Sequence, residues 1–178
     1  MHIVKQNCYA VVAVGSTISQ SLVRHATPND GAGISWEHWS NDRSNIPGPD
    51  TVHVDAFPAL DEYPSSVLQD INFTWANGST ASFYSAQDAA TTQVHFGWMQ
   101  DYGIDGAFVQ RFVSDVMGQP TLAARDRVFT QCMHAAEATG RAFAVEYDVS
   151  GVSDADLLNA LTTDWAHLTA SEANGAWA

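Results

Sequence analysis

The sequence is poor in basic residues, in cysteine and in long apolar runs. Only 7 Lys and Arg residues stand against 20 Asp and Glu residues, and the formal net charge is -13. Nucleic acids and anionic membrane surfaces are bound through basic patches, so this balance argues against both kinds of partner. No apolar run approaches the roughly 18 residues that a membrane-spanning helix needs, which argues against a transmembrane protein.

Metal and cofactor signals are equally scarce. Cys8 and Cys132 do not have zinc-site spacing. The two are able to pair, but Cys132 falls on the apolar face of a predicted helix, which favours a buried thiol. His38, His53 and Asp55 form only an unspecific pattern, and no P-loop, Rossmann fingerprint or Gly-x-Ser-x-Gly motif is present. We therefore predict neither a metal nor a cofactor.

What the sequence does contain is an alternation of helix and strand patterns. A helix is expected from about residue 88 to 102, followed by a buried strand to residue 112. A second helix over 122–139 and a second strand over 141–148 come next, and a third helix begins at Ser153. Strands joined in this way are parallel. At 178 residues the chain is too short for a full eight-fold barrel of about 250 residues, so it forms either a small open sheet or part of a barrel.

The expectations for the rest of the chain are coarser. Residues 26–50 and 64–80 read as loops, and 51–57 as a short strand. In the first helix we expect a buried stripe of apolar residues, namely Val94, Trp98 and Tyr102. The histidines on the three helices, His95, His134 and His167, are expected at the surface or at helix ends.

Two predicted strands end in polar side chains, where α/β enzymes bind their ligands. The first ends in Gln110 and Arg111, and the second in Glu146, Tyr147 and Asp148. Glu146 and Asp148 are two residues apart and point to the same side of a strand. Glycoside hydrolysis usually needs two carboxyl groups, so these two are the catalytic candidates. The alternatives are a helix cap or an ion pair for each carboxylate, and a structural partnership for Arg111.

Aromatic side chains in the predicted loops suit stacking against sugar rings, whose C–H faces they cover. These side chains are Trp36, Trp39, Tyr63 and Trp75. Packed core positions are the alternative interpretation.

Several motifs together resemble the glycoside hydrolase family 71/99-like proteins. They are Trp36-Glu37-His38-Trp39-Ser40, Phe57-Pro58-x-Leu60-x-x-Tyr63, Phe83-Tyr84-Ser85-x-x-Asp88, the stretch from His95 to Phe112, and Tyr147-Asp148-Val149-Ser150-Gly151. The stretch from His95 to Phe112 is the specific part. Members of this group with established activity are endo-acting α-mannosidases and α-1,3-glucanases.

The resemblance implies a (β/α)8 TIM-type barrel with a sugar cleft at the carboxyl ends of the strands. Carried over residue by residue, the substrate-binding positions are Trp36, His38, Trp39, Gln110, Arg111 and Tyr147. About three βα units are present, so residues 1–178 are expected to form a single incomplete barrel domain. Within it, residues 1–29 are a divergent N-terminus, 30–168 the family-like region and 169–178 a divergent tail.

The chain also departs from the family. Residues 16–29 do not match the aromatic end of the family's first strand, Tyr-Gln-Gly-Trp-Phe. No residue matches the later catalytic motif, which is similar to Asn-Glu-Trp-x-Glu, and Glu146 stands where closer relatives usually carry an apolar residue. The endo-mannosidases, in contrast, are similar in having a Glu at the end of the corresponding strand.

These observations lead to one expectation with two alternatives. The chain is expected to be the N-terminal portion of a glycoside hydrolase-like protein that acts on or binds oligosaccharide or polysaccharide, with little or no activity as this short chain. A non-catalytic carbohydrate-binding or scaffold protein is the first alternative, and a gene fragment without function the second. Open sheet edges would favour self-association. Sequons at Asn72 and Asn77, with a weakly apolar N-terminus, tilt the expected location slightly towards secretion.

Overall fold

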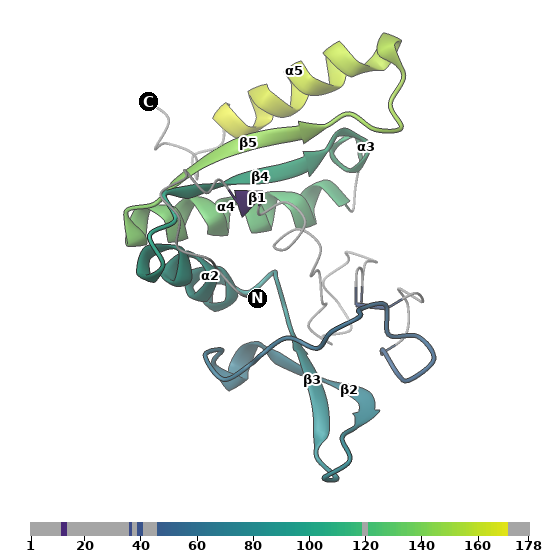
Figure 1. Ribbon diagram of the computed structural model, residues 1–178. Helices are drawn as coiled ribbons and strands as arrows, with labels where there is room; N and C mark the ends of the chain where they lie inside the picture. Colours follow the sequence, from purple (N-terminus) through teal and green to yellow (C-terminus); the bar gives the residue numbers. More distant parts are fainter. Residues whose placement is uncertain (1–11, 14–35, 37–38, 41–45, 119–120, 171–178) are drawn as a thin grey trace.

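A computed structural model describes residues 12–13, 36, 39–40, 46–118 and 121–170. They form a mixed α/β protein with alternating strands and helices and two small open sheets (Figure 1). Within these ranges the strands do not close into a barrel, and no helix is long and apolar enough to cross a membrane.

The first sheet has three parallel strands in the order β1-β4-β5, with β1 at Val12–Ala13, β4 at Gly106–Phe112 and β5 at Ala142–Asp148. The second is an antiparallel hairpin of β2 (Leu68–Thr74) and β3 (Thr80–Tyr84). The helices are a 3-10 turn at Ser65–Val67, α2 (Ala89–Asp101), α3 (Val113–Val116), α4 (Thr121–Thr139) and α5 (Asp154–Ala170).

The predicted order of helices and strands in the C-terminal half is confirmed. Gly103 after α2 and Gly140 after α4 have φ angles of 69° and 64°. Glycine adopts this left-handed backbone at little cost, which is why it commonly ends helices. β4 and β5 then pair along their whole length, with Gln110 beside Glu146. The carboxyl ends of the two strands therefore lie side by side.

Helices α4 and α5 cover the same face of the parallel sheet. The Arg111 side chain on β4 reaches Asp126 on α4 and Asp164 on α5, so both helices lie on the side to which Arg111 points. The apolar core lies on this side and draws on α2, β4, α4 and α5. Its buried members are Phe96, Met99, Ile104, Ala107, Val109, Ala124, Val128, Phe129, Cys132, Ala135, Ala136 and Leu168.

Cys132 is a free thiol inside this core, as its position on the apolar helix face predicts. Burial raises its pKa to about 12, because the apolar surroundings disfavour the thiolate. Cys8 lies outside the described residues. Cys132 is thus a packing residue.

The prediction of a loop over residues 64–80 is wrong, because most of the β2–β3 hairpin lies there. The pairing register shifts between Asp70 and Thr74, so the apolar side chains of β2 do not alternate strictly. Asn77-Gly78 is a common hairpin-turn signal, and Gly78 has the left-handed φ of 85° that such turns use. The sequence therefore contains the signal for the turn, but β2 lacks the regular alternation of apolar and polar residues by which a strand is recognised.

A second apolar cluster joins the hairpin to α2. Trp39 stacks on Phe83 with ring centroids 4.1 Å apart. Its buried members are Trp36, Trp39, Tyr63, Val67, Ile71, Ala81, Phe83 and Tyr84. The strand expected over 51–57 is reduced to a single bridge between Ser40 and Val52. This cluster, rather than strand pairing, orders the segment before the hairpin.

Helix α2 is buried on two sides, which explains why its predicted stripe is only partly right. Val94 and Trp98 pack against the second cluster, but Tyr102 is 61% exposed. Phe96 and Met99 enter the first cluster instead. A helix between two cores does not show one apolar stripe of period 3.6.

We predict that Gly106→Ala destabilises the protein and that Gly97→Ala does not. A Cβ atom at Gly106 would overlap the backbone carbonyl group of Ala142 in the neighbouring strand. Overpacking of this kind costs about 1–3 kcal/mol of unfolding free energy. A Cβ atom at Gly97, inside α2, would have no atom of another element within 4 Å. Because alanine favours a helix more than glycine does, Gly97→Ala should raise the free energy of unfolding by roughly 0.5–1 kcal/mol. Urea unfolding measures both, and equal effects would contradict the pairing of β4 with β5.

Candidate functional site

Strands β4 and β5 separate the predicted site residues onto two faces of the sheet. Side chains alternate along a strand. Arg111 and Tyr147 point to the helices, where both contact Asp164. Gln110 and Asp148, together with Glu146, lie on the opposite face. The residues predicted as one site therefore form two.

On the helix side, Arg111 is the centre of a buried ion network. Its Nε and Nη2 atoms donate to the two carboxylate oxygens of Asp164 at 2.9 and 2.6 Å. Nη2 also donates to Asp126 at 2.9 Å, and the Tyr147 hydroxyl donates to Asp164 at 2.7 Å. The Arg111 side chain is only 1% exposed and that of Asp164 2%. A bidentate pair of this kind fixes both direction and distance between its two elements.

Burial and the two carboxylates together determine the charge states in this network. Burial alone would lower the pKa of Arg111, but the hydrogen bonds and charges of Asp164 and Asp126 outweigh it and raise the pKa. Burial, aided by the hydrogen bond to Asp164, raises the pKa of Tyr147. Arg111 is thus permanently charged and Tyr147 permanently protonated at neutral pH, so neither is suited to proton transfer.

The opposite face, called here the open face, consists of Phe108, Gln110, Ala144, Glu146 and Asp148. Gln110 Nε2 donates to Asp148 Oδ2 at 2.9 Å, and Glu146 is exposed beside Gln110. Phe108 precedes Gln110 by two residues and is 40% exposed. An exposed aromatic ring next to convergent polar groups is the composition of a ligand site for a partly apolar, hydroxyl-rich molecule.

Asp148 is a fixed, ionised carboxylate. The Ser150 backbone N–H donates to its Oδ1 at 2.9 Å, while Gln110 holds its Oδ2. The hydrogen bonds from Ser150 and then from Gln110 lower the pKa of Asp148, because they favour the charged form. Asp148 therefore suits accepting hydrogen bonds or stabilising positive charge, and does not suit donating a proton.

Sequence reasoning missed Phe108 as a surface residue. The apolar run from Ile104 to Phe112 predicts a buried strand, and a strand covered on both faces is apolar throughout. Among the described elements, helices cover only the face of β4 that bears Val109 and Arg111. The alternation of these two residues with Phe108 and Gln110 is the signal that distinguishes the two faces.

The aromatic residues predicted to stack on sugar are mostly buried. Trp36, Trp39 and Tyr63 belong to the second apolar cluster, which matches the alternative of packed core positions. Trp75 is 40% exposed, but it lies near the hairpin turn. His38 lies outside the described residues. None of the three buried rings is available to a ligand in this conformation.

The prediction that His95 lies at the surface is wrong. His95 is buried, and its Nε2 atom lies 2.6 Å from the Tyr63 hydroxyl oxygen. Its ring stacks on that of Trp98 with centroids 5.4 Å apart. Burial lowers the pKa of His95 to about 4, so the ring is neutral. Its partner Tyr63 is 32 positions earlier, and no local sequence signal joins the two. His134 and His167 are exposed, as predicted.

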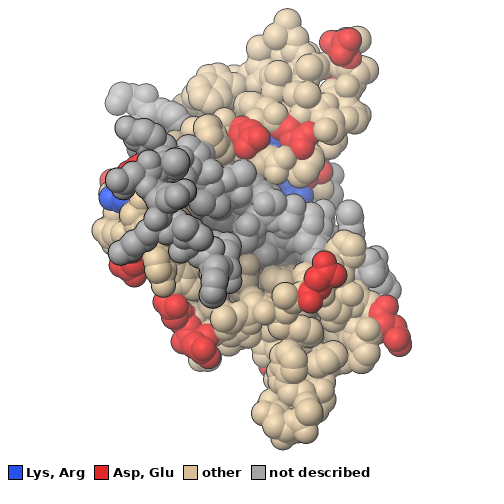
Figure 2. All heavy atoms as spheres, in the orientation of Figure 1, with Lys and Arg blue, Asp and Glu red and all other residues tan. Residues whose placement is uncertain are grey.

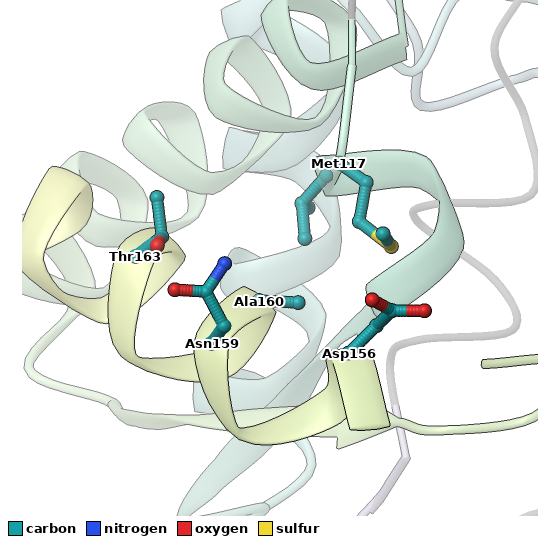
Figure 3. A pocket seen from close by; sticks show the side chains of 6 residues that line it. Met117, Asp156, Asn159, Ala160 and Thr163 are labelled. Atoms are coloured by element: carbon teal, nitrogen blue, oxygen red, sulfur yellow. The ribbon is translucent and has the colours of Figure 1, made fainter. Parts of the chain in front are cut away.

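A hollow of about 170 Å³ lies between α3 and α5 (Figure 3). It is lined by Val116, Met117, Asp156, Asn159, Ala160 and Thr163. Its one carboxylate, Asp156, accepts a hydrogen bond from the Ser153 hydroxyl at 2.6 Å. The hollow shares no lining residue with the open face and is separate from the candidate site.

In the described ranges, no group of three or more His, Cys, Asp or Glu side chains is arranged to hold a metal ion. Comparison of the chain with protein-family models, with curated proteins and with solved structures finds no match in any of the three. Its function has to be inferred from the chemistry of the open face.

We predict that Asp164→Asn lowers the free energy of unfolding by roughly 3–5 kcal/mol, because it leaves the buried guanidinium of Arg111 without its bidentate carboxylate. Asp126→Asn is the matched control. It should cost only about 1 kcal/mol, since the Asp126 side chain is 27% exposed and Asp164 still neutralises Arg111. Thermal or urea unfolding measures both losses. Similar small losses for the two variants would mean that Arg111 is not buried in this way.

We also predict that His95 makes stability depend on pH. The unfolded chain takes up a proton on His95 as pH falls through 6.5, whereas the folded protein does so only at about 4. Stability is therefore fully present above pH 6.5 and is lost as pH falls towards 4, by about 3 kcal/mol in all. His95→Gln removes this part of the slope, and His134→Gln, at an exposed position, leaves it. An unchanged slope in His95→Gln measured by urea unfolding between pH 4 and 7 would count against a buried neutral His95.

Proposed function

We propose that the open face at the carboxyl ends of β4 and β5 binds carbohydrate, within part of a (β/α)8-type barrel related to the 71/99-like glycoside hydrolases. The observation that carries the proposal is the group formed by Gln110, Asp148 and Glu146 beside the exposed ring of Phe108. Ligands of parallel α/β proteins bind at this end of the strands.

The chemistry of the face matches that of a sugar. A sugar ring has an apolar C–H face and several hydroxyl groups. The ring of Phe108 would pack against the C–H face, and the polar side chains beside it would form hydrogen bonds with the hydroxyl groups. Gln110 uses one N–H on Asp148, which leaves its amide oxygen and second N–H for hydroxyls. The ionised carboxylate of Asp148 accepts hydrogen bonds from hydroxyls as well.

The order of the elements supports the barrel part of the proposal. β1, β4 and β5 are parallel and neighbouring, and each is followed by a helix, two of them after an insertion. Among the described elements, β5 precedes α5, β4 precedes the short α3 and then α4, and β1 precedes the β2–β3 hairpin and then α2. Successive units of a (β/α)8 barrel have this arrangement, with the inner face turned away from the helices. In such a barrel the open face would be the inner face.

The proposal assigns different roles to the predicted site residues. Glu146 and Asp148 would be the carboxylates of the site, with Asp148 ionised and Glu146 the candidate proton donor or nucleophile. Arg111 and Tyr147 would be positioning residues that hold the strand ends against α5, because Arg111 is shielded from ligand. Since no residue matches the family's later catalytic motif, we expect binding with little or no hydrolysis.

The test is thermal unfolding of the chain with a panel of α-mannosides and α-glucans. A sugar that binds the native state raises the unfolding temperature. When the free sugar concentration is a hundred times its Kd, the free energy of unfolding increases by about 2.7 kcal/mol. Gln110→Ala should weaken binding of that sugar at least about tenfold, since one lost polar contact in a site costs on the order of 1.4 kcal/mol. Asn159→Ala, at an exposed position on α5, should bind like the unchanged chain. No stabilisation by any sugar, or equal binding by Gln110→Ala, would contradict the proposal.

A non-catalytic carbohydrate-binding protein is the second candidate. The observation that favours it is Asp148, whose carboxylate already has hydrogen bonds from Ser150 and Gln110. Glu146→Gln separates the candidates, because it keeps the shape of the side chain and removes its charge and its acidity. Loss of a residual hydrolysis with binding retained supports the hydrolase, and the absence of hydrolysis in both forms with binding retained supports the binding protein.

A further inference from the structure

The outer part of the β2–β3 hairpin, beyond Asp70 in β2, carries no charged side chain. From Ile71 to Gln87 the sequence contains no Asp, Glu, Lys or Arg, although the chain as a whole is strongly acidic. The hairpin projects from the rest of the described structure, and Figure 2 shows its tip without acidic or basic side chains. Trp75 near the tip is 40% exposed. Strand edges are usually protected by charged side chains, and between Leu68 and Tyr84 this hairpin has only one, Asp70 in β2.

The turn of the hairpin holds an Asn-x-Ser sequence in a defined geometry. The backbone N–H and the hydroxyl of Ser79 donate to Asn77 Oδ1 at 3.0 and 2.8 Å. The Gly78 N–H donates to the Trp75 carbonyl at 2.8 Å, and the Trp75 N–H to the Ser79 carbonyl at 2.8 Å, which closes the loop. All of these residues are exposed.

This geometry fixes the orientation of the Asn77 amide. A backbone N–H is always a donor, so the amide atom facing Ser79 is the oxygen. The amide nitrogen has no hydrogen-bond partner among the described residues. The Ser79 hydroxyl, hydrogen-bonded to Asn77 Oδ1, lies beside the group that would react.

We propose that Asn77 is an acceptor site for an N-linked glycan. The side-chain amide nitrogen would form a bond to C1 of the first sugar of a lipid diphosphate-linked oligosaccharide. The bond from C1 to the diphosphate oxygen breaks and the lipid diphosphate leaves with the bonding electron pair. The proton lost by the amide passes to a base of the enzyme that transfers the glycan. The glycan would cover the uncharged outer part of the hairpin, and surface loops with Asn-x-Ser/Thr are its usual sites. This inference goes beyond carbohydrate binding at the open face and does not depend on it.

The same hairpin contains an internal comparison. Asn72-Phe73-Thr74 is also an Asn-x-Thr sequence, but Asn72 lies within β2 and its backbone N–H donates to the Pro47 carbonyl at 2.8 Å. A Cβ atom at Gly48 would lie 3.5 Å from the Asn72 Cβ, so this segment packs directly against Asn72. Asn77 has the freer surroundings, and we expect it to be occupied to a greater extent than Asn72.

The experiment is expression of the full chain behind a cleavable secretion signal in a eukaryotic host. Glycans are removed from the total chain, retained and secreted, by a peptide N-glycosidase in heavy-oxygen water. This treatment converts a glycosylated Asn to labelled Asp, which peptide mass spectrometry locates. The expected result is label on Asn77 in most of the chain, and on Asn72 to a smaller extent or not at all. Since the label is read on the unchanged chain, the result does not depend on the folding of any variant.

Variants then test the role of the turn. Asn77→Gln and Ser79→Ala should each abolish the glycan at this site, since one removes the acceptor and the other the recognised hydroxyl. Thr80→Ala, at the next exposed position, keeps the Asn-x-Ser sequence and should keep the glycan. An unlabelled Asn77, label on Asn72 alone, or a glycan that survives Ser79→Ala would overturn the proposal.

Discussion

The charge of Arg111 is the constraint on which the parallel sheet depends. A guanidinium removed from water is costly unless carboxylates pair with it, and Arg111 is buried in β4. Asp164 on α5 and Asp126 on α4 both accept hydrogen bonds from Arg111 and supply the opposite charge. The Tyr147 hydroxyl on β5 donates a hydrogen bond to Asp164. Arg111 therefore links β4 to both helices, and Asp164 extends this network to Tyr147 on β5, near the carboxyl ends of the two strands.

The alternation of a strand turns this constraint into a division between two faces. Because Arg111 points to the helices, its neighbour Gln110 must point away from them. Gln110 there meets Asp148 and lies beside Glu146, whose strand is held in register by the same network. A ligand bound to the open face, as proposed, would contact two strands whose carboxyl ends the ion network on the other face holds in place. Sites on such rigid elements hold their geometry better than sites on loops.

The C-terminal half of the fold could be predicted from sequence because its signals are local. Glycines stop α2 and α4, and apolar runs of strand length follow them. The candidate site was predicted less well. The alternation rule was applied to Glu146 and Asp148, but Gln110 and Arg111 were assigned to one site although adjacent strand residues point to opposite faces.

The remaining differences depend on contacts between distant residues. Trp39 is buried because it stacks on Phe83, and His95 because Tyr63 packs against it. In both pairs a loop residue contacts a helix or strand far along the chain, and such a contact produces no periodic pattern of residues from which it could be predicted. The β2–β3 hairpin was missed for a related reason, since the register shift in β2 breaks the period of two by which strands are recognised.

The central claim is that the two faces of β4 and β5 have different roles, ligand binding on one and structural support on the other. The most direct measurement is the side-chain amide signal of Gln110 in 1H–15N nuclear magnetic resonance spectra during titration with the oligosaccharide that stabilises the chain. The account predicts that this signal shifts in proportion to the sugar bound, while the Nε–H signal of Arg111 stays in place. A Gln110 signal that stays fixed while signals elsewhere in the protein move would contradict it.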